Sequence, residues 1–276
     1  MVLAIVVSVT LLLIVQGRQT PGGRAEYVAL GSSYAAGAGL GKLQTGSPWL
    51  CARSVGGYPQ RLARKLEMPV VDMSCGGAVT RHLVRGGQFF QGPQVRVVGP
   101  GARLVTITIG GNDVGYVGDL SLLAARKDKG LFAMLVRSMW KGPKPREARG
   151  FDGLKTELVA TIRDVRRRAP EATVVVATYP AILPRAGTCD AIALTETEAA
   201  MMRQVGDDLA EVTRTAAREA GALVVDMNAL GVGHDACSAS PWVTGWKKAG
   251  PAPFHPTSAG AEAVAEAIAV ALTHAD

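Results

Sequence analysis

The chain has 276 residues, of which 48% are hydrophobic and 19% are charged, and its formal net charge is +7. This composition excludes a disordered chain, and the length is sufficient for one α/β domain with a sizeable core. The basic residues match no nucleic-acid-binding module, so we expect no nucleic-acid partner. A cluster of four arginines lies near the end of one predicted helix, which favours a solvated helix end over a site for an anionic surface: Arg163, Arg166, Arg167 and Arg168.

The amino-terminal segment is apolar almost without interruption from residue 2 to residue 15. Its length is typical of the hydrophobic region of a signal peptide and falls short of the ~20 residues that span a bilayer. We therefore predict a signal peptide or amino-terminal anchor over residues 1–17, a linker over 18–25 and one catalytic domain over 26–276. A buried strand or core helix is the alternative for the first segment. A signal peptide or anchor implies a secreted or cell-envelope protein, with any membrane association through this end.

Four cysteines lie far apart in the sequence, at positions 51, 75, 189 and 237. In an exported protein, an even number of cysteines favours disulfide bonds. A zinc site is the alternative, but the chain contains no Cys-x-x-Cys pair. We expect two disulfides and no metal.

Five apolar runs predict buried strands: residues 27–30, 69–73, 104–109, 173–178 and 222–226. Several are rich in valine and isoleucine and do not alternate with polar residues, which is typical of parallel strands covered on both faces. Helical patterns occupy four intervening or following segments: residues 58–66, 151–168, 194–220 and 257–272. The third of these contains a capping-box sequence at residues 195–198. Strands that alternate with helices predict a single three-layer α/β/α domain around a five-stranded parallel sheet.

Such sheets place active sites at the carboxyl ends of their strands. Ser33 follows the first strand on a tight turn, although a serine there is more often a helix cap. Residues 110–112, Gly-Gly-Asn, follow the third strand, where the glycines allow close approach of a ligand and the asparagine offers an amide donor. We expect the next residue, Asp113, to hydrogen bond within its own turn or cap a helix. His255 precedes the last helix, and Pro256 fits the start of that helix.

The order and types of these residues resemble the SGNH/GDSL hydrolase family, whose four sequence blocks are named after a serine, a glycine, an asparagine and a histidine. The resemblance runs from about residue 27 to residue 268 and implies a flavodoxin-like fold. The matching blocks are residues 31–34, 74–78, 110–113 and 255–257. In the second block, Gly77 is the better match and Gly76 is the alternative.

Two further segments, residues 51–59 and 237–242, resemble the secreted, disulfide-bonded lipases and esterases of actinobacteria. This closer resemblance implies that the disulfides pair Cys51 with Cys75 and Cys189 with Cys237.

The resemblance also implies an enzyme that hydrolyses carboxylic esters of lipids or acylated carbohydrates. Ser33 would attack the ester carbonyl after His255 takes its proton, and an acyl-enzyme would form. The oxyanion hole would consist of the Ser33 N–H, the Gly77 N–H and the Asn112 side chain. We expect a monomer, a small-molecule or lipid ester substrate and no cofactor. The alternatives are an acyltransferase on cell-envelope glycans or lipids, and a catalytically inactive surface-binding module on the same fold.

Two positions depart from the family pattern. Ser32 stands where an aspartate usually precedes the nucleophile. This change should affect the mechanism little, because that aspartate is not the base. Ala252 stands three residues before His255, where an acidic residue normally orients the imidazole. We therefore expect the Ala252 carbonyl to accept the histidine Nδ1–H. The alternatives are three remote carboxylates, those of Asp113, Asp226 and Asp235.

Residues 114–150 form the longest stretch without a matching block. Six apolar residues recur there at helical spacing: Leu131, Phe132, Leu135, Val136, Met139 and Trp140. Such a stripe is usually packed on the core. The alternative is a flap that contacts the acyl chain, because an insertion after the third block would emerge near the site.

Overall fold

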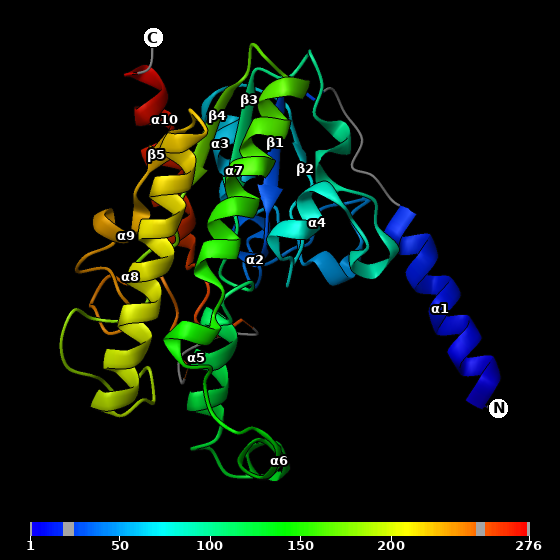
Figure 1. Ribbon diagram of the computed structural model, residues 1–276. Helices are drawn as coiled ribbons and strands as arrows, with labels where there is room; N and C mark the ends of the chain where they lie inside the picture. The colour runs from blue at the N-terminus through cyan, green and yellow to red at the C-terminus, as the bar shows by residue number, and fades with distance from the viewer. Residues whose placement is uncertain (1, 19–24, 247–251, 275–276) are drawn as a thin grey trace.

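A five-stranded parallel sheet forms the centre of the protein, in the strand order β2-β1-β3-β4-β5 (Figure 1). The computed structural model describes residues 2–18, 25–246 and 252–274. Every strand coincides with a predicted apolar run to within one residue at each end. The strands are β1 (Tyr27–Gly31), β2 (Val70–Asp72), β3 (Leu104–Thr108), β4 (Thr173–Ala177) and β5 (Leu223–Val225).

The central strands are apolar on both faces because both faces are covered. In β1, Val28 and Leu30 join one buried cluster, and Tyr27 and Ala29 join a second cluster on the opposite face. Alternate residues of a strand point to opposite faces, so each strand must supply two cores. This burial explains why the runs do not alternate with polar residues.

Helices cover the sheet in two layers, which gives the three-layer α/β/α domain that the sequence predicts. One layer consists of α4 (Thr80–Val84), α5 (Tyr116–Ala125), α7 (Phe151–Arg168) and α8 (Glu196–Glu219). The other consists of α3 (Tyr58–Lys65) and α10 (Ser258–Thr273). Figure 1 shows α7 and α8 side by side in front of the strands.

Local capping sets the starts of the two helices that follow long loops. Thr195 caps α8 by accepting a hydrogen bond from Glu198 N, and the Glu198 side chain accepts from Thr195 N, as in a capping box. Thr257 caps α10 by accepting from Gly260 N. Pro256, which we expected to fit the start of this helix, stands directly before the cap residue and pairs with Val243 in an isolated β-bridge.

The amino-terminal helix α1 (Val2–Arg18) extends away from the sheet (Figure 1). Val7, Val9, Leu11, Leu12 and Val15 are about half exposed, so this segment is not a core element. No helix within the described ranges is long and apolar enough to cross a membrane. Most of the predicted linker, residues 19–24, lies outside the described residues.

Two disulfides, Cys51–Cys75 and Cys189–Cys237, join loops that are distant in sequence. This pairing is the one that the resemblance implies. The zinc alternative is wrong, because all four cysteine sulfurs are in disulfide bonds.

The remaining short helical segments connect these layers: α2 (Ser33–Ala36), α6 (Leu131–Met139), α9 (Met227–Leu230), η1 (Trp49–Cys51), η2 (Gln88–Phe90), η3 (Gln94–Val97) and η4 (Arg146–Ala148).

Candidate active site

The turn after β1 separates the roles of two adjacent serines. Gly31 has φ +147°, and a Cβ there would lie 2.3 Å from the Thr108 carbonyl oxygen, so only glycine fits. Ser32 is fully buried, and its hydroxyl lies 2.7 Å from the Tyr179 hydroxyl. Ser33, the first residue of α2, is partly exposed. Ser33 is therefore the serine that a ligand can reach.

The Ser33 hydroxyl faces the imidazole of His255 across 222 residues of sequence. Ser33 Oγ lies 2.8 Å from His255 Nε2, and His255 Nδ1 lies 2.8 Å from the Pro253 carbonyl oxygen. A carbonyl oxygen can only accept, so Nδ1 carries the proton and Nε2 is free to accept from the serine. The geometry is that of a serine paired with a base whose second nitrogen is held by a third group.

The prediction that the Ala252 carbonyl orients the histidine is wrong by one residue. The Ala252 carbonyl oxygen instead accepts a hydrogen bond of 3.1 Å from the Thr244 hydroxyl. Thr244 Oγ1 also accepts from His255 N, and Thr244 N donates to the His255 carbonyl. Tyr34 Oη donates to the Phe254 carbonyl. Each carbonyl from residue 252 to residue 255 thus has its own donor, and only that of Pro253 faces Nδ1.

The residue before the histidine has an unusual backbone conformation. Phe254 has φ +57° and a fully buried side chain. A left-handed conformation costs a non-glycine residue about 1–2 kcal/mol, which the burial of the ring offsets. This turn lets the imidazole of His255 bend back to the carbonyl two residues earlier.

The glycine and asparagine blocks lie beside the turn that carries Ser33, because backbone hydrogen bonds join the three loops. Cys75 N donates to the Gly31 carbonyl, and Ser32 N donates to the Thr108 carbonyl, both at 3.0 Å. Asn112 Nδ2 donates to the Ala78 carbonyl at 2.8 Å. An amide group has two N–H donors, so one remains for a ligand after this contact.

Gly77 is exposed and has φ +76°, in the left-handed region that favours glycine. Its neighbour Gly76 donates its own N–H to the Cys51 carbonyl. That contact makes Gly77 the better candidate of the two for an oxyanion donor.

The three remote carboxylates have other partners. Asp113 accepts from Thr80 N at the start of α4, so it caps a neighbouring helix. Burial raises the pKa of the Asp113 carboxyl to about 6. Asp226 pairs with Arg214, and the Asp235 side chain accepts from Cys237 N. Within the described residues, therefore, none of these three carboxylates is bonded to His255.

Burial sets the protonation states around the pair. It lowers the pKa of the His255 imidazole below its ordinary value, and the hydrogen bond to the Pro253 carbonyl only partly opposes that shift. It also raises the pKa of the Tyr179 hydroxyl to about 12. The imidazole is thus neutral near pH 7, as a general base must be, and Tyr179 keeps its proton.

Three supporting residues escaped the sequence analysis. Tyr34 stands inside the serine block, and Tyr179 follows the fourth predicted strand, so the rule about carboxyl ends of strands could have found Tyr179. Thr244 stands in a loop with no local signal, and only its contacts in the folded chain identify it.

The sequence and the fold of the chain are similar to those of known lipases. Residues 29–263 match the model of the GDSL-like lipase/acylhydrolase family. The chain is 32% identical to Lipase 2 of Streptomyces coelicolor over 257 residues, which cover 87% of this chain and 83% of that protein. It is 30% identical to a lipase of Streptomyces rimosus over 85% of this chain and 82% of that protein.

Two solved structures share the fold over most of their length. The extracellular lipase from Streptomyces rimosus superimposes with a TM-score of 0.73 and 28% identity, over 90% of this chain and 99% of that one. Phospholipase A1 from Streptomyces albidoflavus gives 0.72 and 28%, with the same coverage of both chains. The chain belongs to the GDSL-like lipase/acylhydrolase family and is an ester hydrolase of the SGNH type.

Proposed function

We propose that the protein hydrolyses carboxylic esters with Ser33 as nucleophile and His255 as its general base. The observation that carries the proposal is the continuous hydrogen-bonded chain from Ser33 Oγ through the imidazole to the Pro253 carbonyl. A serine hydroxyl is a weak nucleophile until a positioned base removes its proton.

The reaction would proceed in two halves. His255 Nε2 takes the Ser33 proton as Oγ attacks the ester carbonyl, and the imidazolium then protonates the leaving alcohol. An acyl-enzyme remains, and water activated by the same imidazole releases the acid. The Pro253 carbonyl would hold the ring in the productive tautomer and partly offset the charge of the imidazolium.

The developing oxyanion would be bound by the Ser33 N–H, the Gly77 N–H and the second N–H of the Asn112 amide. Hydrogen bonds hold the three loops that carry these groups together before any substrate binds. Donors placed in advance need little reorganisation during the reaction, and loss of one typically costs about 3–4 kcal/mol of transition-state stabilisation.

A fluorophosphonate probe followed by peptide mapping tests the nucleophile without knowledge of the natural substrate. We expect the label on Ser33, none on the Ser33→Ala variant, and labelling retained in Ser32→Ala. Ser32→Ala is the matched control because Ser32 is adjacent but buried against Tyr179. Label on Ser32 would overturn the assignment.

A second experiment tests what orients the histidine. We expect Asp113→Asn, Asp226→Asn and Asp235→Asn each to stay within about tenfold of wild-type turnover on a short aryl ester, because loss of a true triad carboxylate costs about 10⁴. If one of the three variants is folded but as inactive as His255→Ala, then that remote carboxylate, and not the Pro253 carbonyl, orients the histidine.

We also propose that the substrate is a lipid or other acylated ester that the enzyme meets outside the cytoplasm. The apolar helix over residues 2–18 and the two disulfides favour export, with residues 1–17 as signal peptide or anchor. The relatives are named lipases, and one structural neighbour is named a phospholipase A1. Protein sequencing of the amino terminus of the exported protein distinguishes cleavage after residue 17 from a retained anchor.

Transfer of the acyl group to an alcohol would use the same acyl-enzyme. Product analysis with a glycan or glycerol acceptor separates the two reactions. Free acid as the main product supports hydrolysis, and an acylated acceptor in excess of free acid would make the protein a transferase.

A further inference from the structure

The helix α6 (Leu131–Met139) presents an apolar face to solvent. It packs against α5, with Ala133 and Val136 as its buried residues. Its other large hydrophobic side chains are between 43% and 76% exposed, which makes this the densest run of exposed apolar residues outside α1: Leu131, Phe132, Met134, Leu135 and Met139. The expectation of a stripe packed on the core is therefore wrong for most of its residues.

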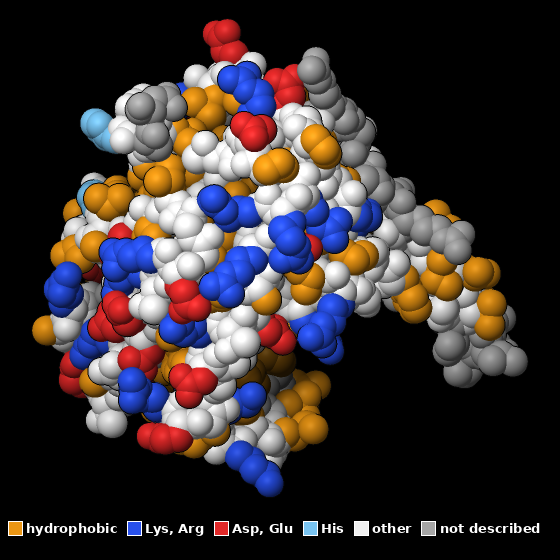
Figure 2. Space-filling model, turned by 45° about the horizontal axis from the view of Figure 1, so that its top comes forward, with side chains coloured by type: hydrophobic (Ala, Val, Ile, Leu, Met, Phe, Trp, Pro, Cys, Tyr) orange, Lys and Arg blue, Asp and Glu red, His pale blue; other side chains and the backbone are white. Residues whose placement is uncertain are grey.

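These five side chains share one side of the helix. At about 100° per residue, they fall within an arc of roughly 160° that includes a single polar residue, Ser138. Figure 2 shows hydrophobic side chains gathered at the foot of the molecule with basic side chains beside them. Soluble proteins rarely expose a contiguous apolar patch of this kind unless it binds something.

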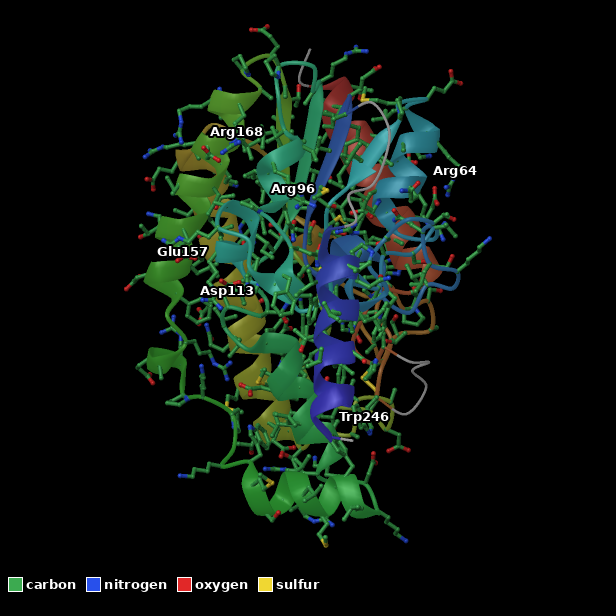
Figure 3. The ribbon with its side chains drawn as sticks, turned by 90° about the vertical axis from the view of Figure 1, so that its right-hand side faces the viewer. Arg64, Arg96, Asp113, Glu157, Arg168 and Trp246 are labelled. Atoms are coloured by element: carbon green, nitrogen blue, oxygen red, sulfur yellow. A yellow bond between two sulfur atoms is a disulfide. The ribbon has the colours of Figure 1, made fainter. Side chains whose placement is uncertain are left out.

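The patch lies at the same end of the protein as the catalytic pair. In Figure 1, α5 and α6 lie beyond the carboxyl ends of the strands, where α2 begins. A hydrogen bond of 2.9 Å from Trp246 Nε1 to the Asp128 carboxylate joins the α5–α6 turn to the loop before His255. The Trp246 ring in turn stacks with Phe254, whose conformation sets the imidazole. Figure 3 shows Trp246 close to α6 at the foot of the molecule.

The surroundings of the patch are basic. Residues 126–144 contain six basic residues and one acidic residue, and two of the six, Arg126 and Lys127, form ion pairs with Glu198. Lys129 precedes the helix, Lys141 follows it, and both are exposed. A second copy packed on this face by twofold symmetry would bring the two basic rims together, whereas an anionic surface would complement them.

We propose that α6 docks the protein on an anionic lipid bilayer. Its apolar arc would enter the boundary between headgroups and acyl chains, with the flanking lysines among the headgroup phosphates. This docking would turn the end of the sheet that carries Ser33 toward the lipid. The inference goes beyond the proposed function, because a catalytically inactive protein would bind in the same way.

The test is a vesicle flotation assay with the full chain carrying Ser33→Ala, so that binding does not depend on hydrolysis. Vesicles contain either phosphatidylcholine alone or equal parts of phosphatidylcholine and phosphatidylglycerol. The test variant adds Phe132→Ser and Leu135→Ser. The matched control adds Leu230→Ser and Val232→Ser, two other exposed apolar residues at and after α9. All proteins carry the same α1, so a difference between variants reports on α6.

We expect the test variant to lose at least about tenfold in partitioning onto the anionic vesicles, and the control to bind as the parent does. Lys129→Gln with Lys141→Gln should weaken binding about fivefold per lysine on the anionic vesicles only. When Ser33 is left unchanged, the protein with Phe132→Ser and Leu135→Ser should hydrolyse a soluble aryl ester at the wild-type rate, which would show that these substitutions do not disturb the fold.

Two results would overturn the inference. One is equal vesicle binding by the α6 variant and the control, which would assign any binding to α1. The other is a dimer in lipid-free sedimentation velocity that the α6 substitutions convert to monomer, which would make the patch a contact between two copies of this chain.

Discussion

Residues 252–255 and the helix α6 both lie at the carboxyl end of the sheet, yet different forces hold them. The first segment has a donor on each of its four carbonyl oxygens and a fully buried phenylalanine at its centre. The helix has two small buried side chains and a large exposed apolar face. One region is specified entirely by contacts within the chain, and the other has an apolar surface that no residue of the described chain covers.

This difference separates two requirements of the proposed function and of the proposed docking on lipid. In the proposed mechanism, His255 must be held within a fraction of an ångström, because a base out of reach of its proton is inactive. A docking surface needs apolar area and charge but no fixed geometry. Substitutions should therefore affect turnover in the first region and lipid binding in the second.

The largest effect is expected from His255→Ala. Turnover on a short aryl ester should fall by about 10⁴-fold or more, because Ser33 loses the acceptor of its proton. The melting temperature should change little, which circular dichroism measures. Phe132→Ser in α6 is the control, and we expect its turnover to equal that of the wild type. A His255→Ala enzyme that keeps a tenth of its activity would refute the proposed base.

Removal of the disulfide that holds the glycine loop should have the next largest effect. Cys51→Ser with Cys75→Ser opens a link across 24 residues, worth about 3 kcal/mol of unfolding free energy in the chain-entropy model. Urea unfolding measures this free energy, with the slope fitted separately for each protein because the unfolded chain without the link exposes more surface. We also expect lower turnover, because Cys75 N bonds to the Gly31 carbonyl beside Ser33, the proposed nucleophile. Equal stability of the variant and wild type would contradict the prediction.

Thr244→Val should lower turnover about 10- to 100-fold. Valine has the same shape but leaves the Ala252 carbonyl and His255 N without the hydroxyl that bridges them. The loss should appear in kcat and not in KM, and Thr244→Ser should restore most of it. An equal loss in Thr244→Ser would indicate a packing role in place of a positioning role.

The pH dependence tests the electrostatics of the rigid region. Burial lowers the pKa of His255, so the neutral, active imidazole persists as the pH falls through 6.5. The acid limb of kcat/KM on a neutral ester should lie below pH 6.5, with more than half of the plateau rate retained at that pH. A limb above pH 6.5 would indicate a nearby carboxylate that stabilises the charged ring.

The smallest effect on stability is expected at α6. Leu131→Ser and Met139→Ser should each change the unfolding free energy by less than about 0.5 kcal/mol, because both side chains are more than 60% exposed. Leu154→Ser, on a core-facing position of α7, is the contrasting control and should cost several times more. Large losses at Leu131 and Met139 would mean that the helix supports the core after all.

Much of the fold was present in the sequence, for reasons that are local. Uninterrupted valine- and isoleucine-rich runs predict parallel strands covered on both faces, and all five strands lie where those runs are. The boundaries of α7 were predicted to the residue, and a capping box marks the start of α8. The serine, the asparagine and the histidine each stand beside the end of a predicted strand or helix, but they were singled out because their order and types together resemble the SGNH/GDSL family.

Only the folded chain decided which groups surround the histidine. Four consecutive carbonyls from residue 252 to residue 255 are alike in sequence, and the choice among them depends on Thr244 and Tyr34, which reach them from distant segments. The apolar spacing of α6 likewise predicted a helix but not the side that faces solvent. Periodicity and composition fix the type of an element, whereas hydrogen-bond partners and exposed faces depend on contacts between residues far apart in the chain.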